Sequence, residues 1–111
     1  MSQQDAVDLV AWNEERFLRI QVKGSNLRSE RDRTPVYQMQ LARGSKKKAL
    51  PTVKDYDLLA LVGIQNRRCL FLATEQVQQY TKRISPKRFE NPEIEYETWI
   101  ESLRIINGRL G

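Results

Sequence analysis

Apolar and polar residues alternate in two short segments near the start of the chain. Residues 7–12 are rich in β-forming side chains, and in residues 17–23 every second residue is apolar. The polar stretch 13–16 between them is typical of a turn. The pattern therefore predicts a β-hairpin whose second strand ends at Gly24.

Two apolar runs in the middle of the chain predict a second hairpin. Residues 57–64 and 69–73 are largely apolar, and a polar turn separates them. Runs of this kind are typical of strands that are buried on both faces, so we place this hairpin at the centre of a sheet. Residues 36–41 predict a further strand, whereas residues 24–35 and 44–48 have the polar, charged composition of loops.

Helical signals are confined to the second half of the chain. A short helix is expected over residues 74–80, followed by irregular chain over residues 82–92. The last helix is expected to have Asn91 as its N-cap, apolar residues at helical spacing over residues 93–107, and Gly108 as its end. This succession of strands and helices predicts one α/β domain with a mixed central sheet flanked by helices.

The amino-acid composition limits the partners and the catalytic mechanisms that are open to this chain. The net charge of +5 favours a polyanionic partner, and we expect nucleic acid, although many soluble proteins are mildly basic without one. The chain has no histidine, which excludes a Ser-His-Asp triad, a Cys-His dyad and a histidine zinc site. Any metal would need oxygen ligands, which favours Mg²⁺, Mn²⁺ or Ca²⁺.

Cysteine content and hydropathy suggest a compartment. The single cysteine, Cys69, cannot form an internal disulfide, which fits a reducing environment. Because Cys69 lies in an apolar run, we expect a small buried residue and not a nucleophile. No signal sequence or long apolar segment is visible, so we expect a cytoplasmic protein that does not contact a membrane.

Three polar side chains are expected to converge on one face of the first hairpin. Both common hairpin registers set Asp8 opposite Gln21, with Cβ atoms about 5 Å apart, and Lys23 follows on the same face. A carboxylate and an amide oxygen can hold a hard cation, and an ammonium can stabilise charge on a reacting phosphate. The alternative is an exposed strand on which Asp and Lys alternate with apolar residues without any catalytic role.

The segments VDLVAW and FLRIQVKGS resemble the PD-(D/E)xK nuclease superfamily, and most closely its intron-associated homing endonuclease branch, in which Gln can replace the second acidic residue. The run YDLLALVG, in which Asp57 opens the strand, resembles a later part of the same family. The resemblance implies a restriction-endonuclease-like fold and hydrolysis of DNA phosphodiesters with Mg²⁺ or Mn²⁺. It implies Asp8, Gln21 and Lys23 as catalytic residues, with Asp8 and Gln21 as the metal ligands.

The N-terminal region departs from the family pattern. The family usually has a helix before the first strand that supplies an acidic residue, but only seven residues precede Asp8. We therefore expect this helix to be short or missing, so that the single domain, residues 1–111, is N-terminally truncated or split. A partner chain would then supply the helix, or the protein would act as a homo-oligomer, a dimer or tetramer, in a prokaryotic, phage or organellar setting. Two alternatives keep the nuclease-like fold: a non-catalytic nucleic-acid-binding module and an interaction subunit.

Basic loops supply the candidate DNA contacts. Loops that follow the catalytic strand can reach along a DNA backbone, where each contact adds salt-dependent affinity. The candidates are Ser25, Arg28, Arg31, Arg33, Arg43, Lys46, Lys47 and Lys48. The alternative is a solvated charged loop, because acidic residues dilute the first cluster.

The aromatic residues are expected to pack against other residues and not to stack on bases. No interleaved aromatic and basic pattern is present, so we expect Trp12, Phe17 and Tyr37 in the core or in hairpin packing. Trp99 and Ile100 suit either the core or an oligomer interface, and the pattern does not choose between these.

Overall fold

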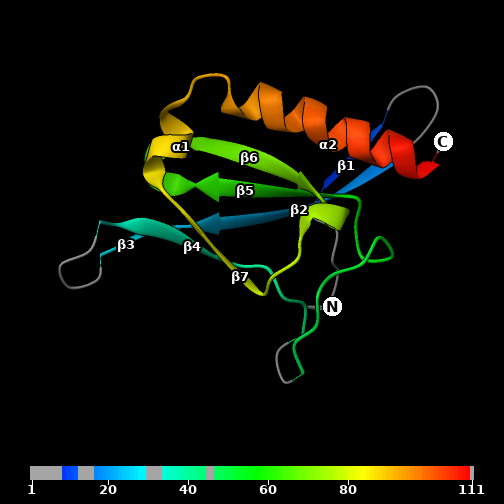
Figure 1. Ribbon diagram of the computed structural model, residues 1–111, viewed down its shortest axis with the longest axis horizontal. Coiled ribbons are helices and arrows are strands. Elements are labelled where there is room, and N and C mark those ends of the chain that lie inside the picture. The colour runs from blue at the N-terminus through cyan, green and yellow to red at the C-terminus, as the bar shows by residue number, and fades with distance from the viewer. Residues whose placement is uncertain (1–8, 13–16, 30–33, 45–46, 111) are drawn as a thin grey trace.

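The computed structural model describes residues 9–12, 17–29, 34–44 and 47–110, which form two small sheets and two α-helices (Figure 1). The strands are β1 (Leu9–Trp12), β2 (Phe17–Ser25), β3 (Leu27–Arg28), β4 (Val36–Gln40), β5 (Leu58–Gly63), β6 (Arg68–Ala73) and β7 (Thr81–Ile84). The helices are α1 (Pro86–Glu90) and α2 (Ile94–Leu110), and 3₁₀ turns follow β5 (Ile64–Asn66) and β6 (Thr74–Gln76). The larger sheet has the order β1-β2-β5-β6, and the smaller sheet has the order β3-β4-β7.

Both predicted hairpins are present. β1 and β2 are antiparallel, and Trp12 stands opposite Phe17, as the expected register requires. β5 and β6 are also antiparallel, but β5 pairs in parallel with β2, so β5 is central and β6 lies at the edge. The prediction that both runs lie at the sheet centre is therefore wrong for β6. A parallel pair needs a long crossover, and the chain between β2 and β5 supplies it through β3 and β4.

Side chains satisfy the outer edge of β6. Three alternate backbone N–H groups of this strand donate to oxygen atoms of Glu95, Thr98 and Gln76, at 3.2, 3.0 and 2.8 Å. An unpaired strand edge is a template for aggregation, and these contacts occupy the donors that a further strand would need. Because Glu95 and Thr98 belong to α2, the same contacts also fix the helix along β6.

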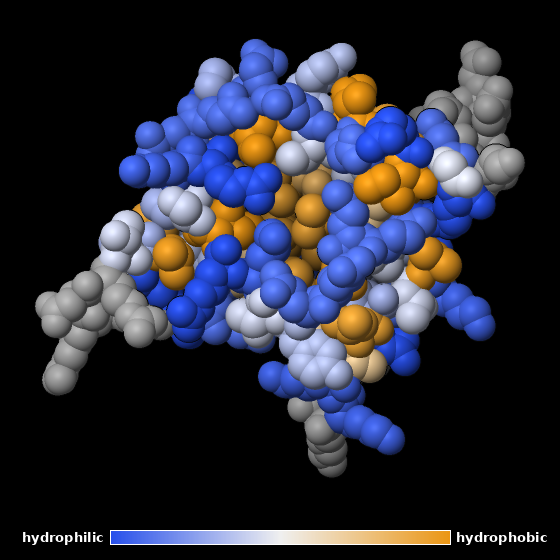
Figure 2. Space-filling model, viewed as in Figure 1, coloured by the Kyte–Doolittle hydropathy of each residue, from blue (hydrophilic) through white to orange (hydrophobic). Residues whose placement is uncertain are grey.

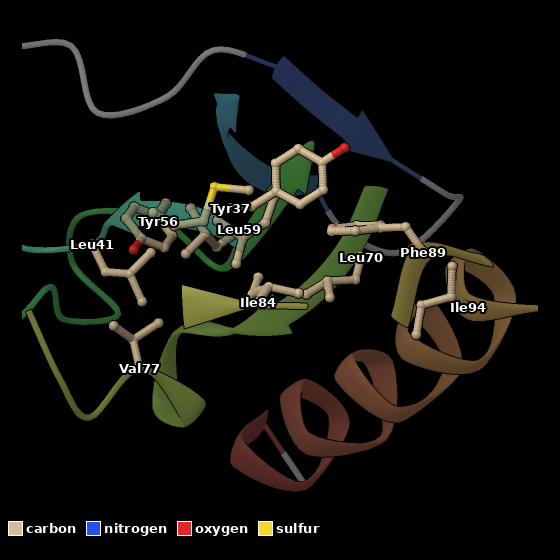
Figure 3. Packing of buried hydrophobic residues seen from close by; sticks show 11 residues of the cluster. Tyr37, Leu41, Tyr56, Leu59, Leu70, Val77, Ile84, Phe89 and Ile94 are labelled. Atoms are coloured by element: carbon tan, nitrogen blue, oxygen red, sulfur yellow. The ribbon is translucent and has the colours of Figure 1, made fainter. Parts of the chain in front are cut away.

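The larger sheet lies between α2 and the smaller sheet (Figure 1). On the α2 side, Leu18 and Ile20 of β2 form an apolar cluster with Ile106 of the helix. On the other side, β5 and β6 pack against β4, β7 and α1, where the rings of Tyr37 and Phe89 meet edge to face with centroids 5.2 Å apart (Figure 3). The predicted mixed α/β, restriction-endonuclease-like architecture is confirmed, with a second sheet as the layer opposite α2.

Residues 74–92 differ from the prediction. The expected helix over residues 74–80 is only the 3₁₀ turn Thr74–Gln76, and the expected irregular stretch contains β7 and α1. β7 is a strand because it pairs with β4, more than forty residues earlier in the chain, which no local pattern reveals. α1 begins after Ser85, whose hydroxyl oxygen accepts a hydrogen bond from the backbone of Lys87.

The last helix begins and ends close to its predicted limits. The side-chain oxygen of Asn91 accepts from the backbone N–H of Glu93 at 3.0 Å, as a capping residue does. The helix itself begins at Ile94, however, so Asn91 closes the turn between α1 and α2 and does not directly precede the helix. The helix continues through Gly108 to Leu110, so the predicted stop is wrong. Arg109, in this additional turn, forms ion pairs with Glu75 and Asp57, and these contacts stabilise the extension.

Gly63 allows two aromatic rings to approach the backbone at the end of β5. A Cβ atom there would lie 2.9 Å from ring carbons of both Phe89 and Tyr37. We expect Gly63→Ala to lower the free energy of unfolding by about 1–3 kcal/mol through overpacking. Gly108→Ala is the matched control, because nothing lies within 4 Å of its Cβ position, and it should raise stability by about 0.5–1 kcal/mol. Urea unfolding compares the two, and a Gly63 variant as stable as the parent would contradict this packing.

Candidate active site on the second strand

β2 presents two different faces. Leu18 and Ile20 point into the cluster beneath α2, whereas Gln21 and Lys23 point to the opposite side and are half-buried. Gln21 stands beside Leu59 of β5, and Lys23 stands beside Leu61 of the same strand. Leu59 belongs to the cluster that the smaller sheet covers, so Gln21 and Lys23 lie at the border of that covered area.

The third predicted site residue, Asp8, lies outside the described residues. The register of β1 with β2 is the expected one from Leu9 opposite Ile20 to the hairpin end. The placement of Asp8 opposite Gln21 needs the same register to continue by one pair, and it stays a prediction. Gln21 itself has a side-chain or backbone interaction within the structure, so it is not a solitary polar group.

The two cations on this face of β2 have different surroundings. The guanidinium of Arg19 is fully engaged: it donates to Asp57 and to the carbonyl oxygens of Val53 and Lys54. Within the described ranges, Lys23 forms no ion pair with a carboxylate. Lys23 is therefore the cation of this face that the described residues leave available to a phosphate.

Asp57 joins three elements at the start of β5. Its carboxylate accepts from the backbone and side chain of Arg19 at 3.0 and 3.2 Å, and from Arg109 of α2 at 2.9 Å. Arg109 also makes a bidentate contact with Glu75, at 2.6 and 2.7 Å. The four side chains form a neutral network, which we call the Asp57 network. The sequence predicts Asp57 as the start of the strand but gives no sign of its partners on α2.

The arginines determine the ionisation of the Asp57 network. Burial acts to raise the pKa of Asp57, but hydrogen bonds from Arg19 and Arg109 and the charge of Arg19 outweigh it and hold the pKa below its ordinary value of 3.8. The hydrogen bonds from Arg109 likewise lower the pKa of Glu75. Both carboxylates are ionised at neutral pH and satisfied by arginines, so Asp57 is a structural residue that positions β2 beside β5.

The described candidates for DNA contact lie near both ends of β4. Arg28 stands opposite Val36 at one end of β4, whereas Arg43 follows the other end of this five-residue strand, about 17 Å away. Arg28 is exposed, and Arg43 is paired with Asp55 at 2.7 Å. Lys47 and Lys48 are exposed on the same side as Arg43, and Arg31, Arg33 and Lys46 lie outside the described residues.

The side chain of Ser25 forms hydrogen bonds within the protein. Its hydroxyl donates to the carbonyl oxygens of Gln38 and Asn26, at 3.0 and 3.1 Å, and so joins the end of β2 to β4. Asn26 separates β2 from β3, and the chain passes from one sheet to the other at this point. This contact makes Ser25 a link between the sheets in the structure, in addition to its predicted contact with phosphate.

The structure also places the aromatic residues and the cysteine for which the sequence predicted a packing role. Tyr37 is fully buried in the core as predicted, whereas Phe17 is 68% exposed and so lies outside the core. Phe17 stands opposite Trp12 in the hairpin, and its predicted hairpin packing stays a prediction. The side chain of Trp12 lies outside the described part of the structure. Cys69 is half-buried, and burial, with a contact to Glu95, raises the pKa of its thiol to about 12, which agrees with a residue that is not a nucleophile.

Two further findings concern the described residues alone. No three His, Cys, Asp or Glu side chains gather there in a way that would hold a metal ion. No helix in these ranges is long and apolar enough to cross a membrane.

The comparison with known families identifies the class of protein. The family model of the PD-(D/E)XK endonucleases matches residues 1–103, which include both hairpins, Gln21 and Lys23, and most of α2. The chain therefore belongs to the PD-(D/E)XK endonuclease family. No curated protein and no solved structure was found to match it.

Proposed function

We propose that residues 1–111 form one nuclease domain that hydrolyses DNA phosphodiester bonds with a divalent metal ion, and that it belongs to the homing-endonuclease-like branch of its family. Asp8, Gln21 and Lys23 are the proposed catalytic residues. The observation that carries the proposal is the placement of Gln21 and Lys23 on one face of β2, at the border of the area that the smaller sheet covers. This placement combines an amide oxygen, a cation and access from solvent.

The donor chemistry fits a hard cation. A chain without histidine offers mainly oxygen ligands, and the half-buried amide of Gln21 is one of them. Asp8 is the proposed carboxylate ligand, and Mg²⁺ or Mn²⁺ the proposed ion. When bound, such an ion activates a water and stabilises charge on the phosphate. Gln21 would orient the ion or its water, and Lys23 would hold a non-bridging phosphate oxygen through its ammonium group.

Cleavage of supercoiled plasmid DNA tests the proposal. The parent protein should nick or linearise plasmid in Mg²⁺ or Mn²⁺ and lose this activity in EDTA. Salt-dependent DNA binding without cleavage in any of these metals would instead identify a non-catalytic binding module. Absence of both binding and cleavage would favour the interaction subunit.

The proposal includes a homo-oligomer or a partner chain. Trp99 packs edge to face on Phe71, with ring centroids 5.1 Å apart, and belongs to the core. Tyr96 and Ile100 lie one turn apart on α2 and are 65% and 46% exposed. If these two residues contribute to self-association, Ile100→Lys should shift the molecular mass measured by light scattering towards the monomer. An unchanged mass would place the interface elsewhere.

A further inference from the structure

The smaller sheet has an outer face that the predicted site does not include. β4 turns Tyr37 and Met39 into the core, so its other residues point away from the larger sheet. Across from them on β7, Arg83 stands opposite Gln38, and Thr81 stands opposite Gln40. Arg28 joins this face from β3, opposite Val36. We call this surface the outer face; its described residues are Arg28, Val36, Gln38, Gln40, Thr81 and Arg83.

The outer face offers hydrogen-bond donors. The side-chain oxygen of Gln38 accepts from Arg28 at 3.3 Å, and that of Gln40 accepts from Thr81 at 3.1 Å. Both amides therefore use an acceptor within the sheet, and among the described residues their NH₂ groups have no hydrogen-bond partner. None of its six described residues is acidic, and Arg28, Gln40 and Arg83 are exposed. Figure 2 shows the whole molecule from the side of Figure 1, where hydrophilic residues surround apolar residues near the middle of the view. The outer face, with its donors and no described acidic residue, suits a partner rich in acceptors.

The spacing of these residues matches duplex DNA. Successive outward residues on a strand are about 6.8 Å apart, which is close to two base-pair steps. Two paired strands about 5 Å apart fit within a major groove that is about 12 Å wide. Arginine pairs with guanine and glutamine with adenine through their edges in this groove, and the methyl group of Thr81 can contact thymine.

The outer face and the proposed active site point in the same direction. Gln21 and Lys23 project from the side of the larger sheet on which the smaller sheet packs. The smaller sheet also contacts the end of β2, where the hydroxyl of Ser25 donates to the carbonyl oxygen of Gln38 on β4. The outer face is the far side of that layer, about 10 Å further out. A duplex on this side of the molecule could therefore contact the outer face through one groove and Lys23 through its backbone.

We infer that the outer face of the β3-β4-β7 sheet reads base sequence in the major groove of duplex DNA, with Gln38, Gln40 and Arg83 as the reading side chains. The inference rests on the proposed DNA endonuclease function and adds a recognition surface to it. Arg28 holds Gln38 in place and adds charge next to the backbone. The loop residues at the other end of β4 would contribute affinity without sequence preference.

Selection from a random duplex library in Ca²⁺ tests the inference. The parent protein should enrich a motif. The double variant Gln38→Thr/Gln40→Thr keeps the net charge and the strand propensity. It should lose base preference at two positions of that motif and bind the selected duplex at least about 10-fold more weakly than the parent. Its affinity for random duplex should differ from that of the parent by less than about 2-fold. Gln78→Thr/Gln79→Thr, at two exposed residues outside the strands, is the matched control and should behave as the parent.

The selection and cleavage results together test the reading surface and the endonuclease activity separately. A parent that enriches no motif, or a double variant that enriches the parent's motif with the parent's affinity, would overturn the inference. If thermal unfolding shows the double variant to be unfolded, Gln40→Thr alone, at an exposed position, should change one position of the motif. A motif that depends on Gln38 and Gln40 in a protein that never cleaves plasmid would uphold the reading surface and reject the endonuclease. Metal-dependent cleavage with no motif would do the reverse.

Discussion

Lys23→Met is expected to reduce metal-dependent plasmid cleavage by about 100- to 1,000-fold while the fold and DNA affinity remain close to those of the parent. Removal of one positioned group that stabilises transition-state charge typically costs this much in rate. Lys23 has no carboxylate partner among the described residues, so its replacement by an uncharged side chain of similar length breaks no ion pair there. Loss of one phosphate contact should weaken DNA binding only a few-fold.

Lys82→Met is the control for this effect. Lys82 is also a half-buried lysine on a strand, but it lies on β7 and points to the inner side of the smaller sheet, beside Met39. Its substitution removes the same charge and should change the cleavage rate by less than about 3-fold. Single-turnover rates with DNA binding measured in Ca²⁺ separate chemistry from affinity. Equal rates for Lys23→Met and the parent would rule out a catalytic Lys23.

Asp57→Asn is expected to lower the free energy of unfolding by about 2–4 kcal/mol at neutral pH. The Asp57 side chain is 14% exposed, and the substitution leaves Arg19 and the 20% exposed Arg109 without their shared negative partner. Removal of one member of a buried ion pair costs about 3–5 kcal/mol, and we take a smaller value because Arg19 is 39% exposed and partly screened. The matching fall in melting temperature is about 8–15 °C.

The matched control is Asp55→Asn. The Asp55 side chain has almost the same exposure, 16%, and also pairs with an arginine. That arginine, Arg43, is 58% exposed, and the other partner of Asp55 is Thr52, only three residues away. This local contact should be worth about 1 kcal/mol or less. If the two variants are equally stable in urea unfolding, the Asp57 network does not carry the connection between β2, β5 and α2.

The effect of Asp57→Asn should depend on pH. The pKa of Asp57 is lowered in the folded protein, so its stabilising contribution is fully present above the ordinary pKa of 3.8 and is lost as the pH falls through the folded value. The difference in stability between parent and variant should therefore be constant from about pH 5 to pH 8 and should shrink below about pH 4. A difference that grew towards low pH would contradict this ionisation.

Only part of the candidate site could be predicted from the sequence. Alternation along residues 17–23 is a local property, and it was enough to set Gln21 and Lys23 on one face of a strand. The hairpin register followed from the length of the turn, and the structure has it from Leu9 onward. The catalytic roles of Asp8, Gln21 and Lys23 remain proposals. The Asp57 network left no signal, because Arg109 lies fifty-two residues from Asp57 and no short-range pattern relates them.

The sequence by itself determined the two hairpins, the last helix and the mixed α/β class, because these depend on the period of apolar residues and on turn length. The tertiary structure decided the rest. β7 is a strand only because β4 pairs with it, β6 is an edge strand only because β2 pairs with β5, and α2 passes Gly108 where Arg109 reaches Glu75 and Asp57. The smaller sheet, and with it the outer face, depends on contacts between residues far apart in the chain, and such contacts leave no periodic trace in the sequence.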